Sequence, residues 1–117
     1  MKNVFICYPK CGTCKKAQKF LENNNIEYQI RDIKENTPTK EELKNWSEQN
    51  NLPLKKFFNT SGLVYKNLNL KEKLSSMSDE EKLELLSSNG MLIKRPIIVN
   101  NQKVLIGFKE EEWKELK

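Results

Sequence analysis

One junction constrains the fold of this chain more than any other feature: a short buried strand leads directly into a helix that carries two cysteines. Residues 3–8 form an apolar run with aromatic and β-branched members, and Pro9 ends it, which predicts a strand. Residues 12–24 place apolar side chains on one helical face and lysines on the other, which predicts an amphipathic helix. The apolar positions of that helix are Cys14, Ala17, Phe20 and Leu21.

Three further segments of the chain predict strands that would form a sheet with the first one. Residues 26–33 alternate between apolar and polar side chains, which predicts a second strand and a right-handed βαβ unit. Residues 97–99 and 104–106 predict a hairpin, Gly107 ends it, and residues 109–116 predict a terminal helix. The fold class is therefore α/β, a small mixed sheet flanked by helices. The apolar side of the second strand is expected to carry Ile26, Tyr28 and Ile30.

The middle of the chain is predicted to be a helical insertion at about residues 38–90. Residues 39–42 and 78–81 both match the capping box, in which a Ser or Thr and a Glu three residues later satisfy the first helical N–H groups. Residues 52–76 are expected to form short helices around a loop at residues 59–62. A chain of 117 residues is long enough for one core, so residues 1–117 are predicted to form a single domain.

The composition of the chain indicates which classes of partner it is expected to bind. The net charge is +5, but 21 basic residues are interspersed with 16 acidic ones, which indicates a solvated surface and predicts no direct contact with nucleic acid. No segment approaches the ~20 apolar residues of a membrane span, and the start does not resemble a signal peptide. We therefore expect a cytoplasmic monomer that does not associate with membranes.

The cysteines predict the chemistry. Cys11 and Cys14 are separated by two residues at the start of a helix, where unpaired N–H groups and the helix dipole favour a thiolate on the first cysteine. In such pairs the first thiol is usually the attacking group and the second, one turn inside, resolves the mixed disulfide. This spacing predicts a redox-active centre that cycles through a Cys11–Cys14 disulfide bond.

Two cysteines at this spacing can also be half of a zinc site, a purely structural disulfide, or inert thiols. A zinc site needs two further ligands, and the chain offers only Cys7 and no histidine, so no metal is expected. Stable structural disulfides are rare in a reducing cytoplasm, and an odd number of cysteines argues against a disulfide framework. Cys7 itself is expected to be a small buried hydrophobe.

Three separated motifs, in order, resemble the glutaredoxin-coupled arsenate reductases and their relatives, the ArsC/Spx family, which includes the Spx regulators and small reductase-like proteins. The resemblance covers essentially the whole chain and implies a thioredoxin-like fold with a helical insertion. The motifs are Tyr8-Pro9-Lys10-Cys11-Gly12-Thr13-Cys14-Lys15, Phe57-Phe58-Asn59-Thr60-Ser61-Gly62, and Arg95-Pro96-Ile97-Ile98-Val99 followed by Gly107-Phe108.

The arginine positions distinguish this chain from the arsenate reductases. The resemblance implies a cis peptide before Pro96, with Arg95 beside the first cysteine. Enzymes of that type hold the oxyanion with three arginines, whose bidentate hydrogen bonds suit a tetrahedral anion. This chain has only Arg31 and Arg95, and only Arg95 falls at a family arginine position. Asn59 and Gly107 lie where other arginines are expected, so arsenate is not the expected substrate.

The resemblance and the residues together predict a thiol-disulfide oxidoreductase. Cys11 and Cys14 are the expected catalytic thiols, and Arg95 is expected to stabilise the thiolate or to bind an anionic group of the substrate. Cys14 stands where arsenate reductases commonly carry serine, which supplies an internal resolving thiol. The substrate-binding residues are expected to be Gly12, Thr13, Asn59, Thr60, Ser61 and Pro96. For residues 59–61 a pocket lining and a plain surface turn both remain open.

No bound cofactor is expected, and glutathione or another thiol is the expected electron donor. The expected partner is a small thiol or a protein that carries a disulfide. The alternative function is that of an Spx-like transcriptional regulator, in which oxidation of the two cysteines switches binding to the RNA polymerase alpha subunit.

Overall fold

The computed structural model describes residues 3–101 and 103–116. The chain divides into two compact units, one formed by Met1–Asp32 with Arg95–Lys117 and the other by Ile33–Lys94. No helix in the described ranges is long and apolar enough to cross a membrane. The single domain expected for residues 1–117 and its insertion at 38–90 stay predictions, and residues 1, 2, 102 and 117 lie outside the described part.

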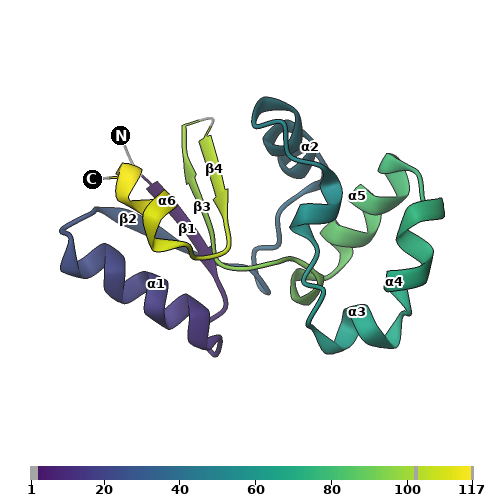
Figure 1. Cartoon of the computed structure of the whole chain (residues 1–117), viewed down its shortest axis with the longest axis horizontal. Helices are drawn as coiled ribbons and strands as arrows, with labels where there is room; N and C mark the ends of the chain where they lie inside the picture. Colours follow the sequence, from purple (N-terminus) through teal and green to yellow (C-terminus); the bar gives the residue numbers. More distant parts are fainter. Residues whose placement is uncertain (1–2, 102, 117) are drawn as a thin grey trace. The chain divides into compact units, whose positions relative to one another are not determined.

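The first unit contains a mixed sheet of four strands (Figure 1). The strand order is β2-β1-β3-β4, with β1 parallel to β2, β3 antiparallel to β1, and β4 antiparallel to β3. The expected βαβ unit and C-terminal hairpin are thus confirmed. The bounds are Asn3–Cys7 for β1, Tyr28–Asp32 for β2, Ile97–Asn100 for β3 and Lys103–Ile106 for β4.

Two helices contribute to one core with the sheet. Helix α1 spans Gly12–Asn23 and α6 spans Glu110–Trp113, followed by a 3-10 turn at Lys114–Leu116. The ring of Phe5 on β1 makes an edge contact with the ring of Trp113, with centroids 6.1 Å apart. The indole Nε1 of Trp113 donates to the carbonyl oxygen of Gly107 at 3.1 Å, so its polar atom is satisfied although the side chain is buried. The cluster comprises Phe5, Cys7, Cys14, Ala17, Phe20, Leu21, Ile26, Ile98 and Trp113.

Strand β2 departs from its prediction in where it begins and in the exposure of one apolar side chain. It begins at Tyr28, and the N–H of Ile26 instead donates to the carbonyl of Leu21 at the end of α1, at 2.9 Å. Ile30 is 54% exposed, although it lies on the side of the strand that was expected to be apolar. Because β2 is an outer strand with a neighbour on one side only, its side chains are less covered than those of β1.

The second unit is helical, as predicted. Both capping boxes are present: the Thr39 hydroxyl accepts from the Glu42 N–H, and the Ser78 hydroxyl accepts from the Glu81 N–H. The Phe57–Phe58 segment lies beside residues 92–94, where the Lys94 N–H donates to the Phe57 carbonyl at 2.7 Å. Its α-helices are α2 (Lys40–Gln49), α3 (Leu63–Asn67), α4 (Leu70–Lys73) and α5 (Asp79–Ser88), and its 3-10 turns are Leu54–Phe57, Leu74–Ser76 and Gly90–Leu92.

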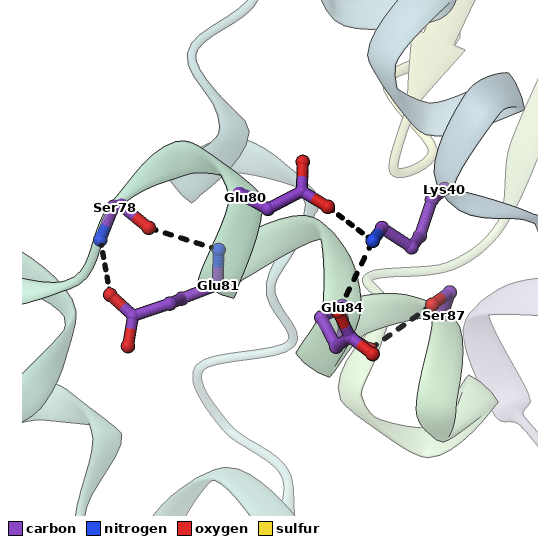
Figure 2. Close-up of polar contacts among 6 residues, drawn as sticks. All are labelled: Lys40, Ser78, Glu80, Glu81, Glu84 and Ser87. Atoms are coloured by element: carbon purple, nitrogen blue, oxygen red, sulfur yellow. Dashed lines mark hydrogen bonds and ion pairs between the residues drawn. The ribbon is translucent and has the colours of Figure 1, made fainter.

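One lysine connects two helices of this unit. Figure 2 shows the Lys40 ammonium of α2 between the carboxylates of Glu80 and Glu84 on α5, with a nitrogen–oxygen distance of 3.1 Å to Glu84. The same view shows Ser78 and Glu81 exchanging two hydrogen bonds at the start of α5. These exposed ion pairs link the surfaces of α2 and α5 but contribute little to stability after solvent screening.

Candidate active site

The loop between β1 and α1 sets the position of the first cysteine. Cys11 is the N-cap residue of α1, with extended backbone dihedrals of φ −87° and ψ 124°. Its N–H donates to the Tyr8 carbonyl at 2.9 Å, and its own carbonyl accepts from the Lys15 N–H at 3.1 Å. The side chain is half-buried and makes no capping hydrogen bond. Its side chain therefore lies at the N-terminus of α1, one turn before Cys14.

Cys14 lies one turn further and is buried, with 2% of its surface exposed. The backbone N–H of Tyr8 donates to its sulfur at 3.3 Å, and the side chains of Cys11 and Cys14 are in hydrogen-bond contact. A hydrogen bond with Cys7 and burial raise the pKa of the Cys14 thiol, while the Tyr8 amide and Cys11 act in the opposite direction. The pair is thus asymmetric: Cys11 is half-buried, whereas Cys14 is buried and its pKa is raised.

Cys7 at the end of β1 completes a group of three thiols. Its side chain is 3% exposed, which confirms the expectation of a buried position. It accepts a hydrogen bond from Cys14, and this bond lowers the pKa of Cys7 against the opposing effects of burial and the charge of Asp32. Cys7 is therefore part of the thiol cluster as well as of the apolar core.

Arg95 and Pro96 lie in the same unit as the thiols. The Arg95–Pro96 peptide is cis, which confirms what the resemblance implied. The guanidinium carbon of Arg95 lies 5.4 Å from the centre of the Tyr8 ring, within the range of a cation–π contact. The carbonyl of Pro96 accepts from the Gly107 N–H at 2.7 Å. Arg95 thus contacts the residue whose backbone holds both Cys11 and Cys14.

The other expected substrate-binding residues fall into two groups. Gly12 and Thr13 are exposed on the first turn of α1, beside the thiols. Asn59, Thr60 and Ser61 belong to the second unit, in the turn between Phe57 and α3, where the Asn59 N–H donates to the Leu92 carbonyl at 2.7 Å. Their role in binding substrate stays a prediction, as does the choice between a pocket and a surface turn.

All three cysteines are free thiols in the structure. Within residues 3–101 and 103–116, no group of three or more His, Cys, Asp or Glu side chains is arranged to hold a metal ion. The expectation that the protein binds no metal stays a prediction.

Sequence reasoning missed the role of Tyr8 and the contact between Cys7 and Cys14. Tyr8 reaches the cluster through its backbone, which no side-chain pattern reveals. The signal for Cys7 was present: in a strand, residues two apart share a face, so Cys7 lies on the same face as Phe5. Since α1 covers that face, a cysteine at its first turn could have been expected to meet Cys7.

The sheet order, the cis proline before β3 and the dithiol at the start of α1 together define a thioredoxin-like fold. The chain belongs to the ArsC family, whose model matches residues 7–116. This match includes all three cysteines, the helical second unit and the C-terminal hairpin.

The relatives of this chain include one protein named as uncharacterized and two named as regulators. The chain is 56% identical to the uncharacterized protein YusI of Bacillus subtilis (strain 168), over 98% of each chain. It is 36% identical to the regulatory protein MgsR of the same organism, over 93% of this chain and 85% of MgsR. It is also 28% identical to the global transcriptional regulator Spx 2 of Bacillus anthracis, over 87% of this chain and 76% of the regulator.

Solved structures share the fold over the same length. An ArsC-family-related protein from Bacteroides fragilis is 56% identical with a TM-score of 0.96, covering 100% of this chain and 98% of its own. A protein from Streptococcus mutans UA159, described as a possible arsenate reductase, is 44% identical with a TM-score of 0.88, covering 96% and 97% of the two chains. The family fold thus carries proteins named as reductases and proteins named as regulators.

Proposed function

We propose that this protein is a thiol-disulfide oxidoreductase that uses Cys11 and Cys14. The observation that carries the proposal is the contact between a half-buried thiol at the N-terminus of α1 and a buried thiol one turn further. An accessible sulfur can attack a substrate, and a neighbouring protected sulfur can then release it. These two properties support the roles proposed for Cys11, the N-cap residue of α1, and for Cys14 in its first turn.

The reaction proceeds in two exchanges. The Cys11 thiolate attacks one sulfur of a substrate disulfide, forming a mixed disulfide and releasing the other sulfur as a thiolate that takes a proton from water. Cys14 then loses its proton and attacks the Cys11 sulfur, which breaks the mixed disulfide and releases the second substrate thiol. The protein is left with a Cys11–Cys14 disulfide, and two electrons from glutathione or another thiol return it to the dithiol. No bound cofactor takes part.

Arg95 supplies positive charge next to the loop that holds the thiols. Its guanidinium lies on the Tyr8 ring, and the Tyr8 backbone contacts both cysteines. We propose that Arg95 binds an anionic group of the substrate, such as a carboxylate of glutathione, by charge-assisted hydrogen bonds. Gly12, Thr13 and Pro96, which belong to the same unit as Arg95, are proposed to line the same site.

Arsenate reduction is not proposed. Three guanidinium groups around the attacking sulfur cannot be assembled from a chain with two arginines. At position 107 the backbone has φ 75°, a left-handed conformation that favours glycine over arginine. We expect no arsenate-dependent thiol consumption when glutathione and glutaredoxin are supplied, and clear arsenate-dependent turnover would contradict this part of the proposal.

Substitution of each thiol by serine tests the assignment of roles. We expect Cys11→Ser to abolish exchange with a glutathione mixed disulfide, because the attacking sulfur is lost. We expect Cys14→Ser to accumulate a mixed disulfide on Cys11, because nothing inside the protein resolves it. Turnover assays and intact-mass spectrometry of both variants measure this. Equal residual activity in the two variants would contradict the assignment.

A second candidate function is regulatory, and the similarity to MgsR and Spx 2 favours it. In this alternative the same dithiol is an oxidation switch, and the partner is the RNA polymerase alpha subunit. Capture of purified alpha subunit by the protein, dependent on the oxidation state of Cys11 and Cys14, would support it. Catalytic turnover with no capture in either state would exclude it. Under either function we expect a cytoplasmic monomer.

A further inference from the structure

Tyr8 connects the loop between β1 and α1 to Arg95. Its carbonyl accepts from the Cys11 N–H at 2.9 Å, and its own N–H donates to the sulfur of Cys14 at 3.3 Å. The guanidinium carbon of Arg95 lies over its ring, 5.4 Å from the ring centre. All four residues belong to the sheet-containing unit. The backbone of Tyr8 thus contacts the two thiol residues, while its side chain contacts the arginine.

The backbone around Tyr8 limits where its ring can lie. Tyr8 follows directly on β1, and its two backbone hydrogen bonds hold it to Cys11 and Cys14. The next residue is Pro9, and a residue before proline is restricted to extended backbone. The side chain is half-buried, so neighbouring atoms restrict its rotamers further. A guanidinium held against this ring therefore has a defined place relative to Cys11.

The contact with the ring bears on how Arg95 binds an anion. A long side chain that samples many rotamers loses this freedom when it binds a ligand, and the loss weakens binding. An aromatic face restricts a guanidinium before the ligand arrives, and it acts on the charge of the group rather than through the N–H donors. An anionic group that meets such an arginine forms charge-assisted hydrogen bonds at a smaller entropic cost.

We infer that Tyr8 is a positioning residue that determines substrate preference: its ring holds the Arg95 guanidinium where it meets the anionic group of a disulfide that Cys11 attacks. Tyr8 takes no part in the exchange of sulfurs. It acts through Arg95, so its ring raises the rate with anionic disulfides relative to the rate with neutral ones. The inference rests on the proposed oxidoreductase function and on the role of Arg95 in it.

Two substitutions distinguish this role from simple packing of the loop. Tyr8→Phe keeps an aromatic face on which a cation can lie, whereas Tyr8→Leu keeps an apolar side chain without that face. Both substitutions leave the backbone N–H and carbonyl of residue 8 in place. A role in positioning Arg95 requires the aromatic face and also requires the arginine, so it is lost in Tyr8→Leu and has nothing to act on in Arg95→Gln.

The experiment compares two disulfides at one pH and at low ionic strength. Glutathione disulfide is anionic and hydroxyethyl disulfide is neutral, and each is added in excess to the reduced protein. Samples are quenched with an alkylating reagent, and intact-mass spectrometry follows the loss of the reduced form. The readout is the ratio of the rate constant with glutathione disulfide to that with hydroxyethyl disulfide. This ratio cancels any change in the reactivity of Cys11 that both substrates share.

The variants are Tyr8→Phe, Tyr8→Leu, Arg95→Gln and the double variant Tyr8→Leu/Arg95→Gln. Tyr8→Met replaces Tyr8→Leu if the latter does not fold. Tyr28→Leu is the matched control, because it removes another half-buried ring of the same unit, whose hydroxyl group bonds to side chains of α1.

We expect Tyr8→Phe and Tyr28→Leu to keep the ratio within about 1.5-fold of wild type, and Tyr8→Leu to lower it about three- to fivefold, the size of effect of one exposed cation–π contact. Arg95→Gln should lower it at least as far, with no further fall in the double variant. An unchanged ratio in Tyr8→Leu, an equal fall in Tyr8→Phe or Tyr28→Leu, or a further fall in the double variant would overturn the role of Tyr8. A wild-type protein that reacts with neither disulfide would overturn the proposed function instead.

Discussion

Tyr8 organises the site through three different groups. Its carbonyl accepts from the N–H of Cys11, its N–H donates to the sulfur of Cys14, and its ring lies against the guanidinium of Arg95. Both backbone contacts are independent of the side chain, so they hold the thiols in place as long as the loop keeps its shape. The ring contact is the part that substitution can remove, and it holds the guanidinium of Arg95 against Tyr8.

Arg95 gives a prediction about substrate charge. We expect Arg95→Gln to slow attack by Cys11 on glutathione disulfide, which is anionic, more than on hydroxyethyl disulfide, which is neutral. The reason is that a guanidinium binds carboxylates through charge-assisted hydrogen bonds that an amide does not replace. Single-turnover rates with the two disulfides measure it. Arg31→Gln on β2 makes the same change in net charge and is the control, and an equal loss of rate for both disulfides in Arg95→Gln would contradict the assignment.

Gly90 gives a prediction about stability. A Cβ atom at this position would lie 2.1 Å from the carbonyl oxygen of Ile33, a backbone atom of the same unit that cannot easily move away. We expect Gly90→Ala to lower the free energy of unfolding by about 1–3 kcal/mol, the usual cost of overpacking. Gly12→Ala is the matched control, because nothing lies within 4 Å of its Cβ position. Urea denaturation compares the two, and equal stability would contradict the close approach seen at Gly90.

At the scale of single elements, α5 shows how local chemistry sets a helix start. The Ser78 N–H donates to the Glu81 carboxylate at 2.9 Å, and this bond lowers the pKa of Glu81. A lowered pKa in the folded state means that the charged carboxylate favours folding. Its contribution is complete above the ordinary range of glutamate and is lost as the pH falls through the lowered value.

The prediction concerns the acid side of the stability profile. We expect the free energy of unfolding to fall between about pH 5 and pH 3, and Glu81→Gln to make this fall shallower, because an amide does not titrate there. Urea denaturation at a series of pH values is the measurement. Glu48→Gln, on an exposed position of α2, is the control. A profile for Glu81→Gln as steep as that of wild type would show that the capping carboxylate is not a source of the acid sensitivity.

The elements differ in how well the sequence predicts them. Helix α1 follows its apolar stripe closely: the residues expected to be buried, Cys14, Ala17, Phe20 and Leu21, are the buried ones. Strand β2 is less predictable. The alternation of apolar and polar residues separates the two faces of a strand, but it does not show whether other elements of the fold cover those faces. Ile30 is exposed for this reason. The hydrogen bond between Cys7 and Cys14 likewise depends on how α1 packs on β1, which local patterns do not specify.

At the scale of the whole chain, the sequence predicted a helical segment inserted between strands of one sheet. The structure has a compact helical unit at Ile33–Lys94, and along the sequence this range falls between the two segments that form the sheet-containing unit. Hydrophobic periodicity finds the helices because each buries one face. It does not give the compact units, since these depend on contacts between residues far apart in sequence, such as Gly90 with Ile33.

The two functions proposed for this chain, a thiol-disulfide oxidoreductase and an oxidation-switched regulator, both require oxidation and reduction of the dithiol. A turnover assay and a binding assay separate the two uses. The step they share comes first: Cys11 and Cys14 must form and break a disulfide under mild conditions.

The most direct test of this account is a titration in glutathione redox buffers, with free thiols trapped and the peptides identified by mass spectrometry. We predict a Cys11–Cys14 disulfide that forms and is reduced reversibly as the buffer is changed, with glutathione attached to Cys11 in Cys14→Ser. A Cys11 that stays unmodified, or that never bridges to Cys14 under mild oxidation, would contradict the account.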